Sequence, residues 1–258
     1  CLSHSKSNVI SGNILTQNEY GIYFSGNLAT QNIIKYNIIA NNGYGIQALY
    51  PSNCNIVYLN NFVQNTNQVH FDAPTLTFTW DNGAEGNYWS DYKGNDLYSG
   101  PYQNETGSDG IGDSPYAING YDSIEPVNED CYPLMAPINA FDAGMWSGEP
   151  RQIHVVSNST ISDFQFNKSE KKISFNVTGE TVSGFCRVTI PNVIIQNMWY
   201  GRYKVLVNGE TWQFQKWTDT KNTYLYFVYP HSTHRVIIVS EFSSTSILLL
   251  IMALTMLS

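Results

Sequence analysis

The segment "NEYGIYF" (residues 18–24) recurs as "NGYGIQA" (residues 42–48), and both contain the phrase Asn-x-Tyr-Gly-Ile. The repeat is longer than this phrase, because "NVISGNILTQNEYGIYF" (8–24), "NIIKYNIIANNGYGIQA" (32–48) and "NIVYLNNFVQNTNQVHF" (55–71) can be aligned. Three columns of asparagine coincide in the alignment: Asn8/Asn32/Asn55, Asn13/Asn37/Asn60 and Asn18/Asn42/Asn65. A fixed period in the low twenties predicts a solenoid, in which each repeat is one rung.

Apolar columns accompany the asparagines and decide which solenoid this is. They are Ile10/Ile34/Val57, Leu15/Ile39/Phe62, Ile22/Ile46/Val69 and Phe24/Ala48/Phe71. A leucine-rich repeat would need several leucines per rung, whereas these rungs are rich in isoleucine and asparagine. The apolar runs are too short for helices and suit short strands between turns. We therefore predict an all-β protein that begins with parallel β-helix rungs over residues 1–85.

The repeated residues have a structural interpretation in such a coil. Asparagine tolerates left-handed backbone angles, and its side-chain amide can bond to the same amide one rung away. Gly21 and Gly45 would permit a bend that a Cβ atom hinders. We expect most rung asparagines to be scaffold rather than ligand contacts.

Charge is scarce and unevenly distributed. Charged residues make up 13% of the 258 residues, aromatic residues make up 14%, and the net charge of −8 disfavours nucleic acid as a partner. Residues 72–137 contain twelve carboxylates and one lysine, whereas residues 138–241 contain eight carboxylates and ten lysines or arginines. This shift predicts a boundary near Pro133–Pro137, with an acidic, aromatic-rich capping segment over residues 86–137.

Residues 138–241 contain short alternating stretches that are typical of strands. Asn208-Gly209 is a strong two-residue hairpin signal within them. About seven strands over a hundred residues predict a β-sandwich of the immunoglobulin-like class.

Each end of the sequence interrupts an element that we expect to be longer. Cys1 aligns with the column of Ser25, partway through a rung, and "ILLLIMALTML" (247–257) is an uncharged run that is too short to cross a bilayer. We therefore expect a piece of a longer protein in which residues 242–258 are part of a C-terminal transmembrane anchor. The remainder would then lie outside the cell.

These residues carry a resemblance to a known family. The asparagine-rich rungs resemble the NosD-like right-handed parallel β-helix family, and "GNYWSDYKGNDLYSG" (86–100) with "GSDGIGDSPYAINGYDSIEP" (107–126) resembles the segment that closes such helices in archaeal surface proteins. The sandwich and apolar tail look like the membrane-proximal part of those proteins. The resemblance implies a right-handed coil and an exported, envelope-attached protein, and the family's namesake belongs to copper-site assembly.

The acidic segment contains candidate metal ligands. Asn95, Asp96, Asp109 and Asp113 lie among glycines, loosely like an oxygen-ligand calcium loop. The alternative is a solvated turn in which aspartate side chains bond to nearby backbone amides. Ca²⁺ is the one cofactor that the sequence indicates.

Aromatic residues crowd the same segment. Tyr88, Trp89, Tyr92 and Tyr98 would form a glycan-stacking surface if they were exposed. If they were buried, they would plug the end of the helix.

Cysteines and sequons add further candidates. Outside a cell, Cys54 and Cys131 could form a disulfide that joins the capping segment to the last rung, whereas Cys186 fits the sandwich core. Asn104, Asn158, Asn167 and Asn176 are N-glycosylation sequons. His231 and His234 have weak metal spacing, and a satisfied surface pair is the alternative.

The sequence favours a cell-surface structural or adhesive protein that binds glycans or envelope proteins. One alternative is a carbohydrate-active lyase or hydrolase whose site lies in upstream rungs, because residues 1–71 contain a single carboxylate, Glu19, and sugar cleavage needs a carboxylate pair or a metal. The other is a copper-site accessory protein, for which the sequence has no cluster of His, Cys and Met.

Overall fold

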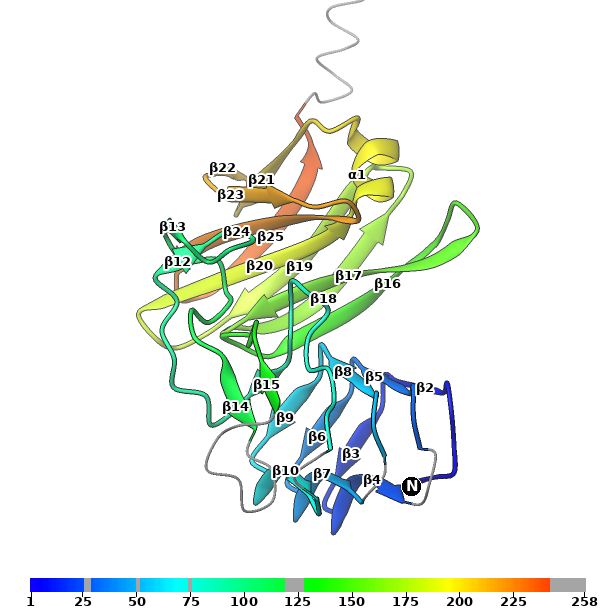
Figure 1. Cartoon of the computed structure of the whole chain (residues 1–258). Coiled ribbons are helices and arrows are strands. Elements are labelled where there is room, and N and C mark those ends of the chain that lie inside the picture. Colours follow the sequence, from blue (N-terminus) through cyan, green and yellow to red (C-terminus); the bar gives the residue numbers. More distant parts are fainter. Residues whose placement is uncertain (26–28, 50–51, 74–75, 119–127, 242–258) are drawn as a thin grey trace, which may run out of the picture. The chain divides into compact units, whose positions relative to one another are not determined.

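The computed structural model describes residues 1–25, 29–49, 52–73, 76–118 and 128–241. The chain divides into two compact units, Cys1–Asn139 and Ala140–Ser258. The described elements are almost all strands, and the helix among them is α1 (Asn192–Trp199) (Figure 1).

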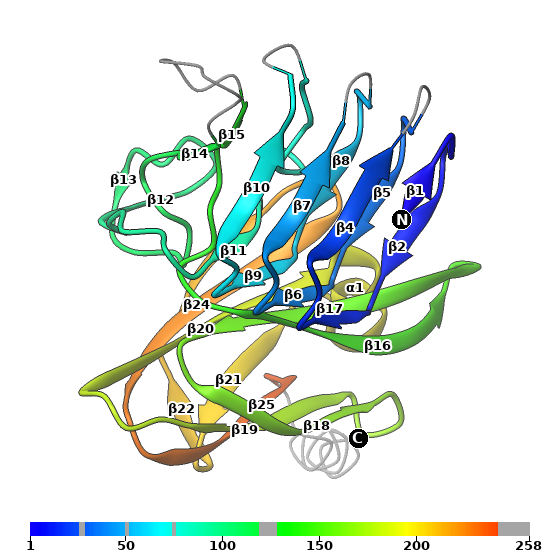
Figure 2. The ribbon, with the colours of Figure 1, turned by 90° about the horizontal axis from the view of Figure 1, so that it is seen from below.

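Three parallel sheets form the first unit. The first contains β1 (Leu2–Ser3), β4 (Tyr20–Ser25), β7 (Tyr44–Ala48) and β10 (Asn67–Phe71). The second contains β2 (Val9–Ser11), β5 (Ile33–Lys35) and β8 (Ile56–Tyr58), and the third contains β3 (Ile14–Thr16), β6 (Ile38–Ala40), β9 (Asn61–Val63) and β11 (Tyr88–Trp89). Each rung contributes one strand to each sheet, as Figure 2 shows for β4, β7 and β10. These rungs thus form a parallel β-helix of about three turns.

The register of the strands confirms the alignment of the repeats. Ile22 lies opposite Ile46, which lies opposite Val69, and the other apolar columns pair in the same way. Ile34, Ile39 and Ile46 are fully buried, so the stacked apolar columns form the core of the coil. Burial by the neighbouring rung supplies the hydrophobic stabilisation that one rung lacks.

Asparagine side chains link the rungs at the corners of the coil. The Oδ1 atom of Asn60 accepts the backbone N–H of Asn37 at 3.0 Å and its Nδ2 at 2.9 Å. Asn60 in turn donates its own Nδ2 to the carbonyl oxygen of Ile34 at 2.9 Å and to Oδ1 of Asn87 at 3.0 Å. The same pattern connects Asn8 to Asn32 and Asn55, and Asn18 to Asn42 and Asn65. We call these three columns the amide ladders.

The expectation that the asparagines themselves take left-handed angles is wrong for the ladders. The left-handed residue is the one before each ladder asparagine: Ser7, Gln31 and Cys54; Gly12, Tyr36 and Leu59; Gln17, Asn41 and Gln64. The bend precedes the asparagine because the amide must point along the stack to reach the next rung. Except for Gly12 these residues carry a Cβ atom, so the ladder bonds must offset an unfavourable backbone conformation.

Gly21 and Gly45 are required for close approach rather than for a left-handed bend. A Cβ atom at Gly21 would lie 2.7 Å from the carbonyl oxygen of Gly45, and one at Gly45 would lie 2.5 Å from that of Gln68. Both contacts are too short for a real Cβ atom. The repeated Tyr-Gly-Ile phrase therefore permits the rungs to approach each other at this corner.

Two short hairpins follow the rungs in the first unit. β12 (Tyr98–Ser99) pairs with β13 (Glu105–Thr106), and β14 (Tyr116–Ile118) pairs with β15 (Asn128–Asp130), both antiparallel. They belong to the acidic segment. The same segment contains the end of the ladder formed by Asn13, Asn37 and Asn60, which we call the middle ladder.

The second unit contains two five-stranded sheets. One has the order β16 (Ile138–Trp146), β17 (Glu149–Ser157), β20 (Ser183–Pro191), β24 (Asn222–Pro230), β23 (Gln215–Thr218). The other has the order β18 (Thr160–Asn167), β19 (Lys172–Thr178), β25 (Thr233–Ser240), β21 (Tyr203–Val207), β22 (Glu210–Trp212). β16 begins in the last residues of the first unit.

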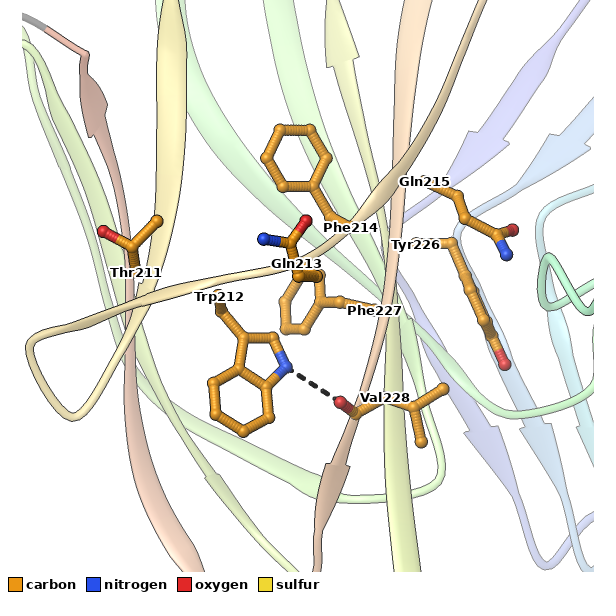
Figure 3. Close-up of a pocket in the computed structure, with 8 residues that line it drawn as sticks. All are labelled: Thr211, Trp212, Gln213, Phe214, Gln215, Tyr226, Phe227 and Val228. Carbon is orange, nitrogen blue, oxygen red and sulfur yellow. Dashed lines mark hydrogen bonds between the residues drawn. The ribbon is translucent and has the colours of Figure 1, made fainter.

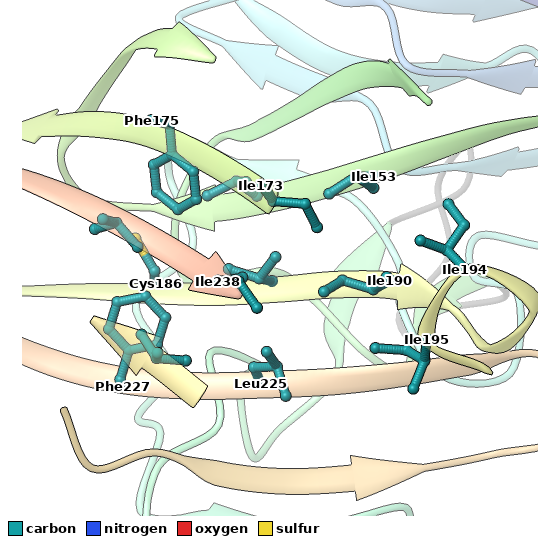
Figure 4. Packing of buried hydrophobic residues seen from close by; sticks show 14 of the residues in the cluster. Ile153, Ile173, Phe175, Cys186, Ile190, Ile194, Ile195, Leu225, Phe227 and Ile238 are labelled. Carbon is teal, nitrogen blue, oxygen red and sulfur yellow. The ribbon is translucent and has the colours of Figure 1, made fainter. Parts of the chain in front are cut away.

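Side chains from both sheets and from α1 form one core. Figure 4 shows Ile153 and Leu225 of one sheet with Ile173 and Ile238 of the other, and with Ile194 of α1. The Asn208-Gly209 hairpin is confirmed, because both residues have positive φ between paired β21 and β22. The sequence did not predict α1, and the immunoglobulin-like assignment stays a prediction.

The predicted anchor, residues 242–258, lies outside the described residues. Within the part of the chain that the structure describes, no helix is both long and apolar enough to span a bilayer.

Removal of a buried ladder amide should destabilise the protein far more than removal of an exposed one. Asn60→Ala should lower the free energy of unfolding by at least about 3 kcal/mol, because it leaves several buried N–H and C=O groups without partners. Asn13→Ala, at the exposed end of the same ladder, should cost about 1 kcal/mol or less. Urea denaturation measures both. Similar losses for the two variants would contradict the structural role of the ladder.

Candidate functional site

The middle ladder ends at a buried carboxylate. Asn87 continues the ladder beyond Asn60, and Oδ2 of Asp130 accepts the backbone N–H of Asn87 at 2.6 Å and its Nδ2 at 3.3 Å. The same oxygen accepts the indole N–H of Trp89 at 2.9 Å, and Oδ1 accepts the N–H of Tyr132 at 3.1 Å. Burial raises the pKa of Asp130 to about 7, although these donors act in the opposite direction. A Cβ atom at Gly86 would collide with this carboxylate, so the glycine makes room for it.

Of the two alternatives for Trp89, burial at the end of the helix is the one that the structure shows. Its side chain is 1% exposed, and it stacks on Phe62 at 4.3 Å and on Tyr116 at 4.4 Å between ring centroids. Trp89 therefore covers the end of the apolar core. The indole N–H fixes its orientation through Asp130.

The other predicted glycan contacts differ in exposure. Tyr88 and Tyr92 are half-buried, and the hydroxyl of Tyr92 donates to the carbonyl oxygen of Ser114 at 2.6 Å. Burial raises the pKa of Tyr88. Tyr98 is 46% exposed and pairs with Thr106 in the first hairpin. A glycan contact at these three tyrosines stays a prediction.

The predicted calcium residues form a compact loop held by backbone amides. Asp96 accepts the N–H groups of Asp109 at 2.9 Å and Gly110 at 2.8 Å, and Asp113 accepts those of Leu97 at 2.8 Å and Tyr98 at 3.1 Å. Asp109 is 2% exposed and accepts the N–H of Ile111 at 3.0 Å.

Asn95 contributes its carbonyl oxygen to the N–H of Asp113 in this loop. Burial first, and then the neighbouring Asp109 and Asp113, raise the pKa of Asp96 to about 7.

In this loop the aspartate side chains accept hydrogen bonds from nearby backbone amides. This geometry matches the alternative to a calcium loop. Within the described ranges, no group of three or more His, Cys, Asp or Glu side chains is arranged to hold a metal ion. Calcium binding at Asn95, Asp96, Asp109 and Asp113 stays a prediction.

The predicted disulfide is not formed in this structure, where Cys54 and Cys131 are exposed and unpaired. The N–H of Cys54 bonds to the carbonyl oxygen of Thr77, and that of Cys131 bonds to the carboxylate of Asp81. Cys186 is buried in the core of the second unit, as expected.

The four sequons occupy different environments. Asn104 and Asn158 are exposed, whereas Asn167 and Asn176 are half-buried. The Nδ2 atom of Asn176, the atom that would carry a glycan, donates to Asp163 at 2.7 Å. That of Asn158 donates to the carbonyl oxygen of Ser183 at 3.1 Å. Glycosylation stays a prediction at all four.

His231 and His234 have separate sets of partners. Ser159 and Thr181 bond to the two ring nitrogens of His231, and Asn208 and Ser232 bond to those of His234. These hydrogen bonds match the interpretation as satisfied histidines.

A cluster of half-buried aromatic side chains on β4, β7 and β10 was not predicted. Tyr20 stacks on Tyr44 with 5.6 Å between ring centroids, Tyr20 lies 5.0 Å from Tyr23, and Tyr44 lies 5.5 Å from His70. Gln47 pairs in register with both Tyr23 and His70. We call Tyr20, Tyr23, Tyr44, Gln47 and His70 the aromatic face. Its signal in the sequence is the tyrosine of the repeated Asn-x-Tyr-Gly-Ile phrase.

The aromatic face carries little charge. The carboxylate of Glu19 accepts a hydrogen bond from the hydroxyl of Tyr20, and this bond raises the pKa of Tyr20. Glu19 is also the single carboxylate of residues 1–71, so no carboxylate pair for sugar cleavage can form within these rungs.

Comparison with known proteins gives one match. Residues 1–94 match the model of the family described as periplasmic copper-binding protein (NosD). No curated protein and no solved structure matches the chain. The match covers the rungs and the start of the acidic segment.

The buried carboxylate of Asp130 should make stability depend on pH. Its pKa is raised by folding, so the folded chain binds more protons than the unfolded chain between about pH 4 and pH 7. Stability should therefore fall as the pH rises through this window, with a melting temperature several degrees lower at pH 8 than at pH 5.

Asp130→Asn should lower the melting temperature at pH 5, because an amide cannot accept all of these N–H groups, and should flatten the pH dependence. The exposed neighbour provides the control, since Glu129→Gln should leave the slope unchanged. Thermal melts followed by circular dichroism measure both effects. A slope that survives Asp130→Asn in full would disprove the assignment.

Proposed function

We propose that the protein is an extracytoplasmic β-helix protein with an adhesive role, and that its aromatic face binds neutral glycans. The observation that carries the proposal is the stack of Tyr20 on Tyr44, which pair in register on neighbouring rungs, with the ring of His70 on the next rung 5.5 Å from that of Tyr44. It places two phenol rings and an imidazole close together on one sheet, beside the largely buried Gln47, which pairs in register with Tyr23 and His70.

The chemistry of this face matches a sugar chain. Aromatic side chains present an apolar body and a polar tip, which suits the CH faces and hydroxyl groups of a pyranose. The rungs lie about 4.8 Å apart, and one pyranose advances an extended polysaccharide by a comparable step. Two successive sugars would therefore meet the equivalent rings of Tyr20 and Tyr44 on successive rungs.

Charge supports a neutral ligand. Residues 1–71 contain one carboxylate and two lysines, Lys6 and Lys35, so the coil offers little electrostatic attraction to a charged polymer. Weak neutral contacts gain strength when several act together along one chain. The proposed activity is binding rather than cleavage.

The location rests on the match of residues 1–94 to a family described as periplasmic. Attachment to the membrane through residues 242–258 and an archaeal-type surface setting are parts of the proposal that come from the sequence resemblance. The copper association of the family name is not included, because the described residues hold no group of His, Cys, Asp and Glu side chains suited to a metal.

Substitution on the aromatic face should reduce glycan binding. The 258-residue chain, multimerised on a fluorescent carrier, would be applied to an array of neutral and acidic glycans at low and high salt. We expect binding to neutral glycans that survives high salt. Tyr44→Ala and His70→Ala should each weaken it about tenfold, which corresponds to the loss of one aromatic contact.

The control is Tyr102→Ala, which removes a tyrosine that is 83% exposed in the acidic segment. Binding that is unchanged by Tyr44→Ala and His70→Ala would refute the role of this face. If modest salt abolished binding, the binding site would be assigned to the acidic segment instead. Turnover of a polysaccharide would contradict the proposal that the protein binds sugars without cleaving them.

A further inference from the structure

The second unit contains an open groove that the proposed function does not use. Its volume is about 590 Å³, and Figure 3 shows the residues that line it, which are Thr211, Trp212, Gln213, Phe214, Gln215, Tyr226, Phe227 and Val228. This volume lies within the range of about 300–1,000 Å³ that is usual for small-molecule sites.

Strand topology creates the groove. β22 is the edge strand of one sheet and β23 is the edge strand of the other, and the chain passes between the two sheets at Gln213 and Phe214. β23 begins at Gln215, which pairs with Tyr226 of β24. β24 continues from Tyr226 to Pro230, beyond the residue that pairs with the start of β23. Its last residues therefore have no neighbour on β23, and a recess lies beside them.

The aromatic walls of the groove are fixed. The indole N–H of Trp212 donates to the carbonyl oxygen of Val228 at 2.9 Å, which holds the ring against β24. Phe214 stacks with Tyr203 at 6.0 Å between ring centroids. A groove whose rings are already held loses little conformational entropy when a ligand binds.

The polar groups in the groove are neutral. Its lining contains no Asp, Glu, Lys, Arg or His. Gln213 and Gln215 are exposed, and their amides can donate to and accept from a ligand, as can the hydroxyl of Thr211. Rings with amides and a hydroxyl, without a charge, match a ligand that has apolar faces and many hydroxyl groups.

We propose that this groove is a second binding site and that its ligand is a neutral oligosaccharide. The site is independent of the aromatic face, because all of its residues lie in the second unit. An extended peptide that added a strand to β24 would need the backbone groups on this edge. The indole of Trp212 already occupies the carbonyl oxygen of Val228, which favours a ligand recognised through side chains.

The test uses the full 258-residue chain carrying Tyr44→Ala, so that the aromatic face does not obscure the result. Calorimetric titration with neutral gluco-, manno-, xylo- and chito-oligosaccharides should show one binding site per chain for at least one of them. In this background, Gln213→Ala combined with Gln215→Ala should weaken that binding at least tenfold. Trp212→Phe should also weaken it, because the ring remains but its hydrogen bond to Val228 is lost.

Lys216→Ala is the matched control, because Lys216 is exposed and adjacent but does not line the groove. It should leave the affinity unchanged, and melting temperatures establish that every variant folds. No oligosaccharide binding, or equal affinity in the double glutamine variant, would overturn the proposal, as would binding of an uncharged extended hexapeptide in place of a sugar. Loss of binding in the Tyr44→Ala background alone would assign all binding to the aromatic face and refute the groove.

Discussion

The hydrogen bonds of the amide ladders are the interaction on which the first unit depends. Each corner contains a residue with a left-handed backbone, and the asparagine after it connects its rung to the neighbouring rungs. The Oδ1 atom of Asn60 receives two N–H groups from one neighbouring rung, and its Nδ2 reaches carbonyl and amide oxygens on both sides. Since a buried unpaired amide is costly, a rung is stable only within the stack.

The ladders have a direction, and this gives the acidic segment a structural role. The amide-to-amide bonds all run from Nδ2 of one asparagine to Oδ1 of the asparagine in the following rung, so the last amide of a ladder has no further asparagine to donate to. The middle ladder finds one in Asp130, and the third ladder passes from Asn65 to Gln68 and on to Asp91. The carboxyl group of an aspartate presents two acceptor oxygens where asparagine presents one, and it can therefore receive the donors at the end of a ladder. Part of the negative charge of this segment thus completes the coil, which is a reason for its acidity besides metal binding.

The two proposed sites use the same chemistry on different frameworks. On the coil, stacking repeats the tyrosine of the Tyr-Gly-Ile phrase on two rungs and brings His70 of the third rung against Tyr44, which gives an aromatic surface suited to a polymer. In the second unit, two sheets end beside each other, and the recess between their edges suits a short ligand. Both surfaces combine aromatic rings with neutral amides, and neither carries the paired carboxylates of a sugar-cleaving enzyme.

The sequence by itself determined the repeat, its register and its buried columns, because stacked rungs place equivalent residues opposite each other. It also determined the Asn208-Gly209 hairpin, since few residue pairs tolerate two positive φ angles. Tertiary structure decided that Asp130, far along the chain from Asn87, accepts the last ladder amide and that Trp89 is buried rather than exposed. It also decided that Tyr44 meets His70 and that β22 and β23 frame a groove. These contacts join residues with no common period, so they follow from how the chain closes the coil and crosses between sheets.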